Sequence, residues 1–334
     1  MVYSQHILIT GGLGYIGQVL TRQLLENTSA KITIVDSNVY SIKSLSDFDA
    51  SSNRVTTIQK DALKFILEDL KLEFSAVIVL HGLVGDPISN KYNEVAKRIN
   101  EIEMKEFLEL VSTRTKKIIF ASTCSNYGIT NSDTLANEDS VLNPLSPYSK
   151  SKVAIEKYIL DKFNNQMEQC NWTILRFATA FGSSPRMRFD LTLNEFTKDS
   201  YFGKELLVYD ADTWRPYLHI EDISNAIRLV MEADLSLVGG QIFNVGDDRN
   251  NITKRGIVDK LMKITPALKV NFEGAGRDPR DYRVDFRKIK KTLKFEASRD
   301  INDGILEILK FLRESKQLSF ETCSILGNFV IQEK

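Results

Sequence analysis

A tyrosine and a lysine stand four positions apart in the segment SPYSKSKVAIEKY, at Tyr148 and Lys152. Residues four apart lie on one face of a helix, and a helix is predicted over Tyr148–Phe163. A free tyrosine has a pKa of about 10, and a neighbouring ammonium lowers it. The pair therefore suits acid/base chemistry, although the same spacing is common on solvated helices. Thr123, at the end of the predicted strand KKIIFAS, offers a hydroxyl to the same substrate oxygen.

Three glycines form a second pattern with chemical meaning. The strand HILIT runs directly into GGLGYIG, which gives Gly11, Gly14 and Gly17 a G-x-x-G-x-x-G spacing before a helix. These glycines permit a tight turn, the approach of a pyrophosphate and close packing of the helix on the strand. The next strand ends in Asp36, whose carboxylate accepts ribose hydroxyls and repels a 2′-phosphate. The pattern predicts a site for NAD. Asp61, after the following strand, either meets the adenine with Ala62 or caps a helix.

The elements that position these residues follow a regular order. Apolar β-branched runs alternate with amphipathic stretches through the first half, which is typical of one parallel sheet with helices on both faces. We predict an α/β protein: a Rossmann-like doubly wound domain over residues 1–180, and a smaller, interleaved C-terminal α/β substrate lobe over 181–315. The tail, 316–334, contains the apolar patch SILGNFVI, which is expected to pack on the molecule or, as the alternative, to bind a partner. The expected helices are Ile16–Leu25, Ala62–Leu70, Tyr92–Val111, Tyr148–Phe163, Glu221–Ala233, Thr253–Ile264 and Ile301–Arg313.

The composition excludes several classes of function. Lys and Arg total 44 and so do Asp and Glu, which gives no basic field for nucleic acid or an anionic membrane. No apolar run is long enough for a membrane span and the start does not read as a signal peptide, so a cytoplasmic protein is expected. Three cysteines and three histidines, far apart, fit neither a disulfide framework nor a metal site.

Six motifs occur along the chain in the order that is typical of one enzyme family: TGGLGYIG, ASTCSNYG, SPYSKSK, LRFATAFG, RPYLHIEDI and FNVG. Over nearly its whole length the chain resembles the extended short-chain dehydrogenases/reductases that act as NAD-dependent nucleotide-sugar epimerases and dehydratases. The resemblance implies a catalytic triad of Thr123, Tyr148 and Lys152, and a homodimer formed by the helices Asn100–Val111 and Tyr148–Phe163. The cofactor contacts expected on these grounds are Gly11, Gly14, Tyr15, Ile16, Gly17, Asp36, Asp61, Ala62, Leu80, His81, Gly82, Asn100, Tyr148, Lys152 and Phe177.

Two departures from that family narrow the reaction. Family dehydratases carry an acidic residue after the strand-end hydroxyl, whereas Thr123 is followed by Cys124 and Ser125, so dehydration is not expected. Cys124 resembles a catalytic cysteine of keto-sugar epimerase/reductases but is displaced by one position, which favours a packing role. His81 replaces a family residue and is interpreted as structural in preference to catalytic.

A nucleoside-diphosphate sugar brings a diphosphate that arginine forks bind well. By resemblance, Arg215 and Arg280 meet the diphosphate and Asn194 meets the diphosphate or sugar. Thr179 stands where many relatives have asparagine. The expected substrate contacts are Thr123, Thr179, Arg186, Arg188, Asn194, Arg215 and Arg280, although an arginine can also be an ordinary surface residue.

These residues predict oxidation at C4 of the sugar, with Tyr148 taking the hydroxyl proton and NAD the hydride. A 4-epimerase returns the hydride to the other face, a 4-dehydrogenase releases the 4-keto sugar, and a ketoreductase runs the reverse reaction. The segments SPRMRFDLTLNEF and DPRDYRV resemble a subgroup with GDP-heptose 4-dehydrogenases and other surface-polysaccharide enzymes. The rival from another class is a non-catalytic NAD-binding regulator.

Overall fold

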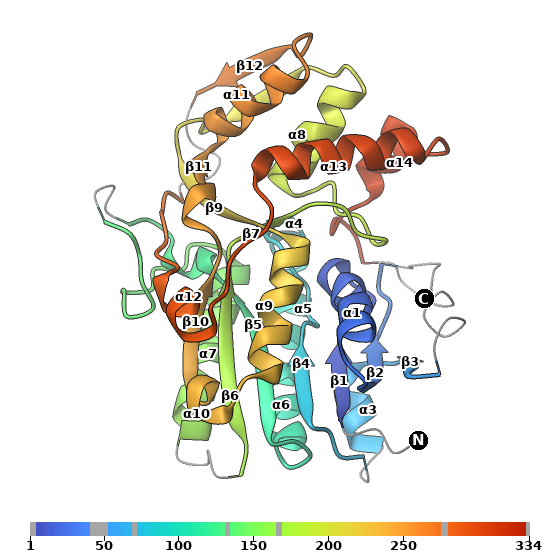
Figure 1. Ribbon diagram of the computed structural model, residues 1–334, viewed down its shortest axis with the longest axis vertical. Helices are drawn as coiled ribbons and strands as arrows, with labels where there is room; N and C mark the ends of the chain where they lie inside the picture. The colour runs from blue at the N-terminus through green and yellow to red at the C-terminus, as the bar shows by residue number, and fades with distance from the viewer. Residues whose placement is uncertain are drawn as a thin grey trace.

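The computed structural model describes residues 5–40, 53–68, 72–130, 134–164, 169–274 and 280–331. Within these residues the centre is a seven-stranded parallel sheet in the order β3-β2-β1-β4-β5-β6-β10 (Figure 1). The strand order reverses between β1 and β4, and ligands of such sheets bind beyond the carboxyl ends of the strands at this point. The predicted Rossmann-like sheet is confirmed. Its strands are β1 (His6–Thr10), β2 (Lys31–Asp36), β3 (Val55–Gln59), β4 (Ala76–Val79), β5 (Lys117–Thr123), β6 (Asn171–Phe177) and β10 (Gln241–Val245).

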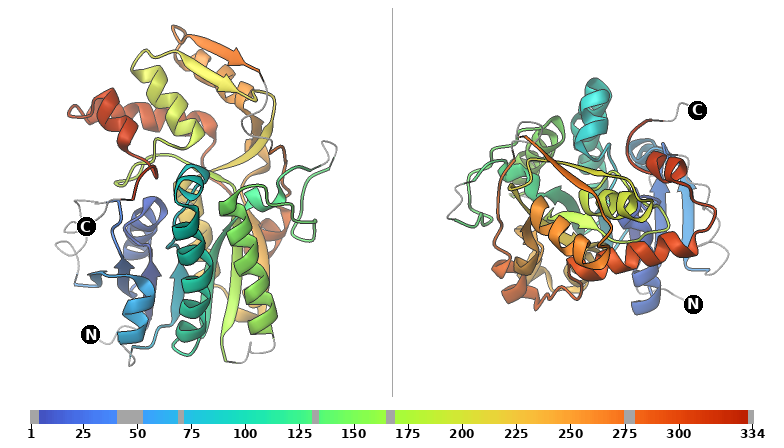
Figure 2. Two further views of the ribbon diagram at one scale, coloured as in Figure 1. Left: turned by 180° about the vertical axis from the view of Figure 1, so that it is seen from behind. Right: turned by 90° about the horizontal axis from the view of Figure 1, so that it is seen from above.

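Helices cover both faces of the sheet (Figures 1 and 2). One face carries α1 (Tyr15–Asn27) and α9 (Ile220–Glu232), whose apolar residues share one buried cluster. The other face carries the remaining helices of this domain: α3 (Ala62–Glu68), α4 (Asp86–Lys91), α5 (Asn93–Lys97), η1 (Arg98–Glu103), α6 (Met104–Ser112) and α7 (Pro147–Phe163). The apolar residues of α3, α6 and α7 share a second cluster, and those of α4 and α5 belong to a smaller third one.

One predicted helix differs in detail. The stretch Tyr92–Val111 is divided into α5, the π-helical η1 and α6. Asn100 lies in the wider turn of η1, and its side chain bonds both backbone groups of Leu83. A π-helical turn of this kind interrupts the regular α-helical ladder.

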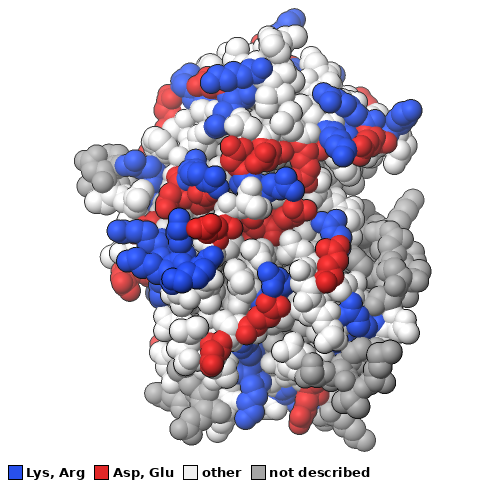
Figure 3. All heavy atoms as spheres, in the orientation of Figure 1, with Lys and Arg blue, Asp and Glu red and all other residues white. Residues whose placement is uncertain are grey.

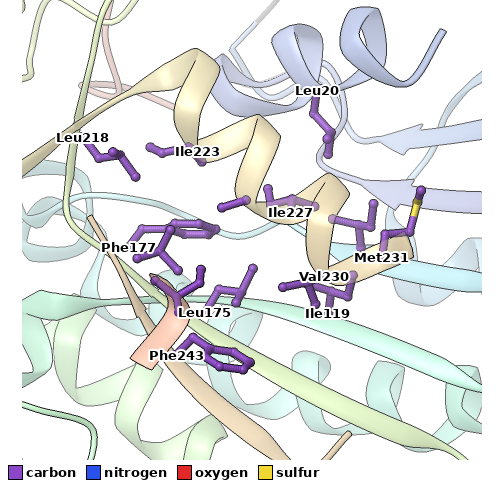
Figure 4. Close-up of a cluster of buried hydrophobic side chains, with 14 of the residues drawn as sticks. Leu20, Ile119, Leu175, Phe177, Leu218, Ile223, Ile227, Val230, Met231 and Phe243 are labelled. Carbon is purple, nitrogen blue, oxygen red and sulfur yellow. The ribbon is translucent and has the colours of Figure 1, made fainter. Parts of the chain in front are cut away.

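The interior between α9 and the sheet is filled by apolar side chains (Figure 4). Lys117, at the start of β5, lies beneath the end of α9, and its Nζ donates to the carbonyl oxygens of Val230 (3.2 Å), Met231 (2.8 Å) and Ala233 (2.8 Å). The last carbonyls of a helix lack partners and carry partial negative charge. The buried ammonium of Lys117 thus caps the C-terminus of α9. The labelled residues of the cluster are Leu20, Ile119, Leu175, Phe177, Leu218, Ile223, Ile227, Val230, Met231 and Phe243.

A second lobe sits over the carboxyl edge of the sheet (Figure 1). Its strands β7, β9 and β11 form one small sheet and β8 and β12 another. The chain passes from this lobe back to the first domain to form α9 and β10 and then returns. The elements of the lobe are β7 (Thr179–Phe181), α8 (Thr192–Tyr201), β8 (Leu206–Tyr209), β9 (Trp214–His219), β11 (Asn251–Thr253), α11 (Lys254–Ile264), β12 (Val270–Glu273), α13 (Ile301–Glu314) and α14 (Phe320–Ile325). Short elements elsewhere are η2 (Cys124–Tyr127), α10 (Leu235–Val238), η4 (Asp248–Asn250) and α12 (Arg287–Leu293).

The surface mixes charges of both signs, and Figure 3 shows Lys and Arg interspersed with Asp and Glu over both lobes. This distribution agrees with the equal totals of 44 basic and 44 acidic residues. Among the described residues, every helix is too short or too polar to cross a lipid bilayer.

Candidate active site

A cavity of about 690 Å³ lies where the strand order reverses, between the carboxyl ends of β1, β4 and β5 and the second lobe. Its wall has two parts. We call the part formed by the first domain around Gly11, Asp36 and His81 the cofactor half, and the part formed around Thr179, Arg188 and Arg215 the substrate half.

The glycine-rich turn shapes the cofactor half. Gly11 has a φ of 73° and its N–H donates to Val35 O at 2.8 Å. A Cβ on Gly17 would stand 2.5 Å from the Cα of Gly12, so only glycine allows α1 to start this close to the turn. The Asp36 carboxylate accepts from the backbone N–H groups of Leu13 (3.0 Å) and Asn38 (2.8 Å) while it lines the cavity.

The structure brings nearly all of the expected cofactor residues to the cavity wall. Asp61 caps α3 by accepting from Lys64 N at 3.0 Å, and it also lines the wall, where its contact with the adenine stays a prediction. Asn100 is the exception among the described residues. Its side-chain amide accepts from Leu83 N (2.8 Å) and donates to Leu83 O (3.0 Å). It supports the loop after β4 instead of reaching the cavity. The residues on the wall are Gly11, Gly14, Tyr15, Ile16, Gly17, Asp36, Asp61, Ala62, Leu80, His81, Gly82, Tyr148, Lys152 and Phe177.

Thr123, Tyr148 and Lys152 meet on the wall between the two halves. Ser146 and Ser149 form a capping box with Pro147 at the start of α7, which places Tyr148 in the first turn beside the end of β5. Lys152 Nζ donates to Ala121 O at 2.7 Å and lies 5.9 Å from the centre of the Tyr148 ring. Thr123 Oγ1 accepts from Ser125 N at 3.1 Å.

Burial dominates the electrostatics of this group. Burial raises the pKa of Tyr148 above its ordinary value, and the nearby Arg188 only partly opposes this. Burial also lowers the pKa of Lys152 to about 8, against the attraction of Glu156. In the chain alone, desolvation thus outweighs the neighbouring charges, and the expected lowering of the Tyr148 pKa by Lys152 together with the positive nicotinamide ring of bound NAD stays a prediction.

The two residues that depart from the family pattern both have structural surroundings. His81 Nδ1 lies 2.6 Å from Thr10 Oγ1, its ring packs edge-on against Phe107, and burial lowers its pKa to about 4. Cys124 is fully buried, its thiol donates to Arg176 O at 3.1 Å, and burial raises its pKa. These contacts agree with a structural histidine and a packing cysteine.

In the substrate half, each expected arginine reaches the wall and already has a contact there. Arg188 binds Asp190 with two hydrogen bonds (3.0 and 2.5 Å), and Arg280 pairs with Asp86 at 2.7 Å. Arg186 donates to Gly327 O at 3.1 Å. Further contacts of this group are Arg186 over the ring of Tyr40, Arg215 over the ring of Tyr282 and Arg215 Nη1 to Trp214 O at 2.7 Å.

Thr179 also lines the wall, but Asn194 does not. The Asn194 side chain is fully buried, accepts from Gly182 N at 3.1 Å, and donates to Tyr15 Oη (3.1 Å) and Arg188 O (2.9 Å). The expected substrate contact of Asn194 is corrected, because its hydrogen bonds hold the segment around Gly182 and Arg188 together and connect it to Tyr15 of the first domain.

The sequence of residues 7–246 matches the NAD dependent epimerase/dehydratase family. The chain belongs to this family. The resemblance noted from the motifs is thereby confirmed, and the protein is an NAD-dependent enzyme.

Individual relatives agree with this assignment. The chain is 27% identical over 310 residues to a probable UDP-arabinose 4-epimerase 3 of Oryza sativa subsp. japonica, which covers 83% of this chain and 73% of that one. It is 24% identical over 331 residues to the UDP-glucose 4-epimerase of Bacillus subtilis (strain 168), covering 89% and 94%. A UDP-glucuronic acid 4-epimerase from Bacillus cereus, solved with UDP-glucuronic acid and NAD, shares the fold with a TM-score of 0.79 at 23% identity, covering 92% and 99%.

The cofactor half of this family member fits NAD by its chemistry. The turn at Gly12 and Gly17, which only glycine permits, leads into the start of α1. Backbone N–H groups at the start of a helix bind a pyrophosphate well. Asp36 supplies a carboxylate at the end of β2 that suits ribose hydroxyls.

Several wall residues were missed by the sequence reasoning. Tyr282 Oη lies 3.2 Å from Ser125 Oγ, and the only sequence signal for this contact was the position of Ser125 two residues after Thr123. Asn328 lies on the wall and donates to Val84 O at 2.6 Å, so this part of the tail packs on the first domain as expected. The missed wall residues also include Tyr40, Asp86 and Asp190.

Proposed function

We propose that this enzyme is a UDP-sugar 4-epimerase that works through a 4-keto intermediate. The observation that supports this most directly is the position of Thr123, Tyr148 and Lys152 between a dinucleotide half and an arginine-lined half of one cavity. Relatives named as UDP-arabinose and UDP-glucose 4-epimerases favour epimerisation over net dehydrogenation. Their names also favour a uridine nucleotide as the substrate.

The residues have distinct tasks in this reaction. The Tyr148 phenolate accepts the proton of the C4 hydroxyl, and Thr123 Oγ1 holds the same oxygen by a hydrogen bond. Lys152, as an ammonium fixed by Ala121 O, favours the phenolate form. Bound NAD supplies the hydride acceptor and a positive ring that further offsets the effect of burial on the Tyr148 pKa. After the keto sugar turns its other face, the hydride returns to C4 and Tyr148 gives the proton back.

The arginine-lined half suits the nucleoside diphosphate. Three segments of the chain, which carry Arg186 with Arg188, Arg215, and Arg280, converge on the same wall. Guanidinium groups bind phosphate oxygens bidentately and hold the sugar in register with Tyr148. The absence of an acidic side chain at Cys124 and Ser125 argues against elimination of water from the keto sugar.

The test uses purified protein whose NAD content has been measured. UDP-glucose, UDP-arabinose and UDP-glucuronic acid are added singly, followed by GDP-, CDP- and dTDP-sugars, with NADH absorbance and product isomers recorded together. A 4-epimerase gives a C4 isomer of unchanged mass without net NADH. A stoichiometric rise in NADH with a product lighter by two hydrogens shows a 4-dehydrogenase, and an inert trace without any isomer contradicts both.

We also propose that the enzyme is a homodimer formed by η1, α6 and α7. Figure 2 shows α6 and α7 running along the same face of the molecule, and the side chain of Ile102 on η1 is 61% exposed. Light scattering on Ile102→Glu and on the unaltered protein tests this, since a charge at an apolar interface disfavours association. A monomeric mass for the unaltered protein contradicts the proposed dimer.

A further inference from the structure

A buried ion pair lies directly behind the reacting residues. Glu156 belongs to α7, one turn beyond Lys152, and Arg176 belongs to β6 next to Phe177. Arg176 Nη2 lies 2.7 Å from Glu156 Oε2, and the two side chains are 4% and 1% exposed. Neither residue lines the cavity within the part of the chain that the structure describes. The pair can therefore influence the reaction only through its neighbours.

The carboxylate of Glu156 joins three elements at the level of the reacting group. It accepts from Ser122 Oγ, from Asn126 Nδ2 at 2.9 Å, and from Arg176 Nε at 3.1 Å. Ser122 pairs with Arg176 across the strands, and the next pair in register is Thr123 with Phe177. One carboxylate thus fixes α7, with Tyr148 and Lys152, against the ends of β5 and β6.

The guanidinium of Arg176 extends the same network toward the substrate half. It donates to Tyr127 Oη at 3.0 Å and to Glu138 O at 3.1 Å. Tyr127 Oη lies 2.7 Å from Asn244 Oδ1, and Asn244 Nδ2 donates to Asp285 O at 3.3 Å. The backbone that carries Tyr282 onto the cavity wall is therefore connected to the pair through Asn244.

We propose that Glu156 and Arg176 are positioning residues that hold Tyr148 and Lys152 in register with Thr123; this inference rests on the proposed function. Apolar side chains of similar volume would fill the same interior, and such replacements of buried ion pairs are often tolerated. What they would lose is the directional, charge-assisted bonding that fixes one arrangement of α7 relative to β5 and β6.

The test is the double variant Glu156→Met with Arg176→Met, since either single change leaves a buried charge without its partner and is expected to fold poorly. The unbranched methionines fill the vacated volume. The rate of C4 isomer formation per bound NAD is expected to fall at least about tenfold, because small misplacements of reacting groups reduce rates strongly. The NAD content and the substrate KM are expected to stay within about twofold.

Lys162→Met is the matched control, because Lys162 of α7 forms an exposed ion pair with Glu109 of α6, and the two side chains are 44% and 48% exposed. It is expected to leave kcat unchanged. A double variant with the rate of the unaltered enzyme, or with a rate loss explained entirely by lost NAD, overturns the positioning role. An unaltered enzyme that is inert with every nucleotide sugar instead contradicts the proposed function, and the positioning role falls with it.

Discussion

The two halves of the cavity are built in opposite ways. The cofactor half is made mainly of backbone turns at strand ends, such as Gly11 after β1, which are set by residues close together in the sequence. The substrate half presents charged side chains that already engage carboxylates of the chain, as Arg188 does with Asp190 and Arg280 with Asp86. The first half has its shape before any ligand arrives. In the second half a diphosphate must compete with carboxylates for the same guanidinium groups.

The largest effect is expected where the two halves meet. Tyr148→Phe removes the proton acceptor but keeps the ring against Lys152, so turnover should fall by about 10²–10⁴-fold while NAD stays bound. The measurements are initial rates and the NAD released on denaturation. Unchanged turnover would mean that Tyr148, where the two halves meet, is not the proton acceptor. An absence of turnover in the unaltered protein, with NAD still bound, would instead strengthen the rival view of a non-catalytic NAD-binding regulator.

The next effect tests whether the cofactor half depends on backbone shape. In Gly11→Ala the new Cβ would stand 2.7 Å from His81 N, and the φ of 73° disfavours any side chain. NAD affinity should fall at least about tenfold. Gly203→Ala is the control: its φ is 66°, but nothing lies within 4 Å of the new Cβ, so only the backbone strain of about 1–2 kcal/mol remains. Equal NAD affinities in both variants would show that contact with the loop after β4 is irrelevant.

This contrast also explains what the sequence could predict. Gly14 follows a recognisable strand, and Asp36 and Thr123 are each the last residue of one. Because the carboxyl ends of parallel strands meet at one edge, their placement on the wall was predictable. Asn100 was misplaced because its π-helical turn and its bonds to Leu83 are tertiary features. The same reason applies in the substrate half to Asn194, whose partner Tyr15 is far away in the sequence.

A smaller effect is expected from the arginines of the substrate half. Arg280→Met should raise the substrate KM by about fivefold to tenfold with little change in kcat, because a charged contact to the diphosphate is lost in ground and transition state alike. Asp86→Asn should lower KM, since it weakens the competing ion pair of 2.7 Å. Arg255→Met, which breaks an exposed pair with Asp212, is the control. If both Arg280→Met and Asp86→Asn leave KM unchanged, Arg280 does not meet the substrate.

The smallest effect concerns the pH dependence of the cofactor half. Burial holds the pKa of His81 at about 4, below the value of about 6.5 expected when the chain is unfolded. Between these values the unfolded state binds more protons, so the free energy of unfolding should fall as the pH drops from about 6.5 toward 4. In His81→Gln, which keeps a polar partner for Thr10, this acid-side loss should be smaller by about 1 kcal/mol. Urea unfolding of the NAD-free proteins across this range measures the difference. If the free energies of unfolding of the two proteins change with pH in parallel, groups outside the cofactor half cause the acid sensitivity. If the two curves converge toward low pH, the cofactor half contains a titrating side chain, His81, in addition to its backbone turns.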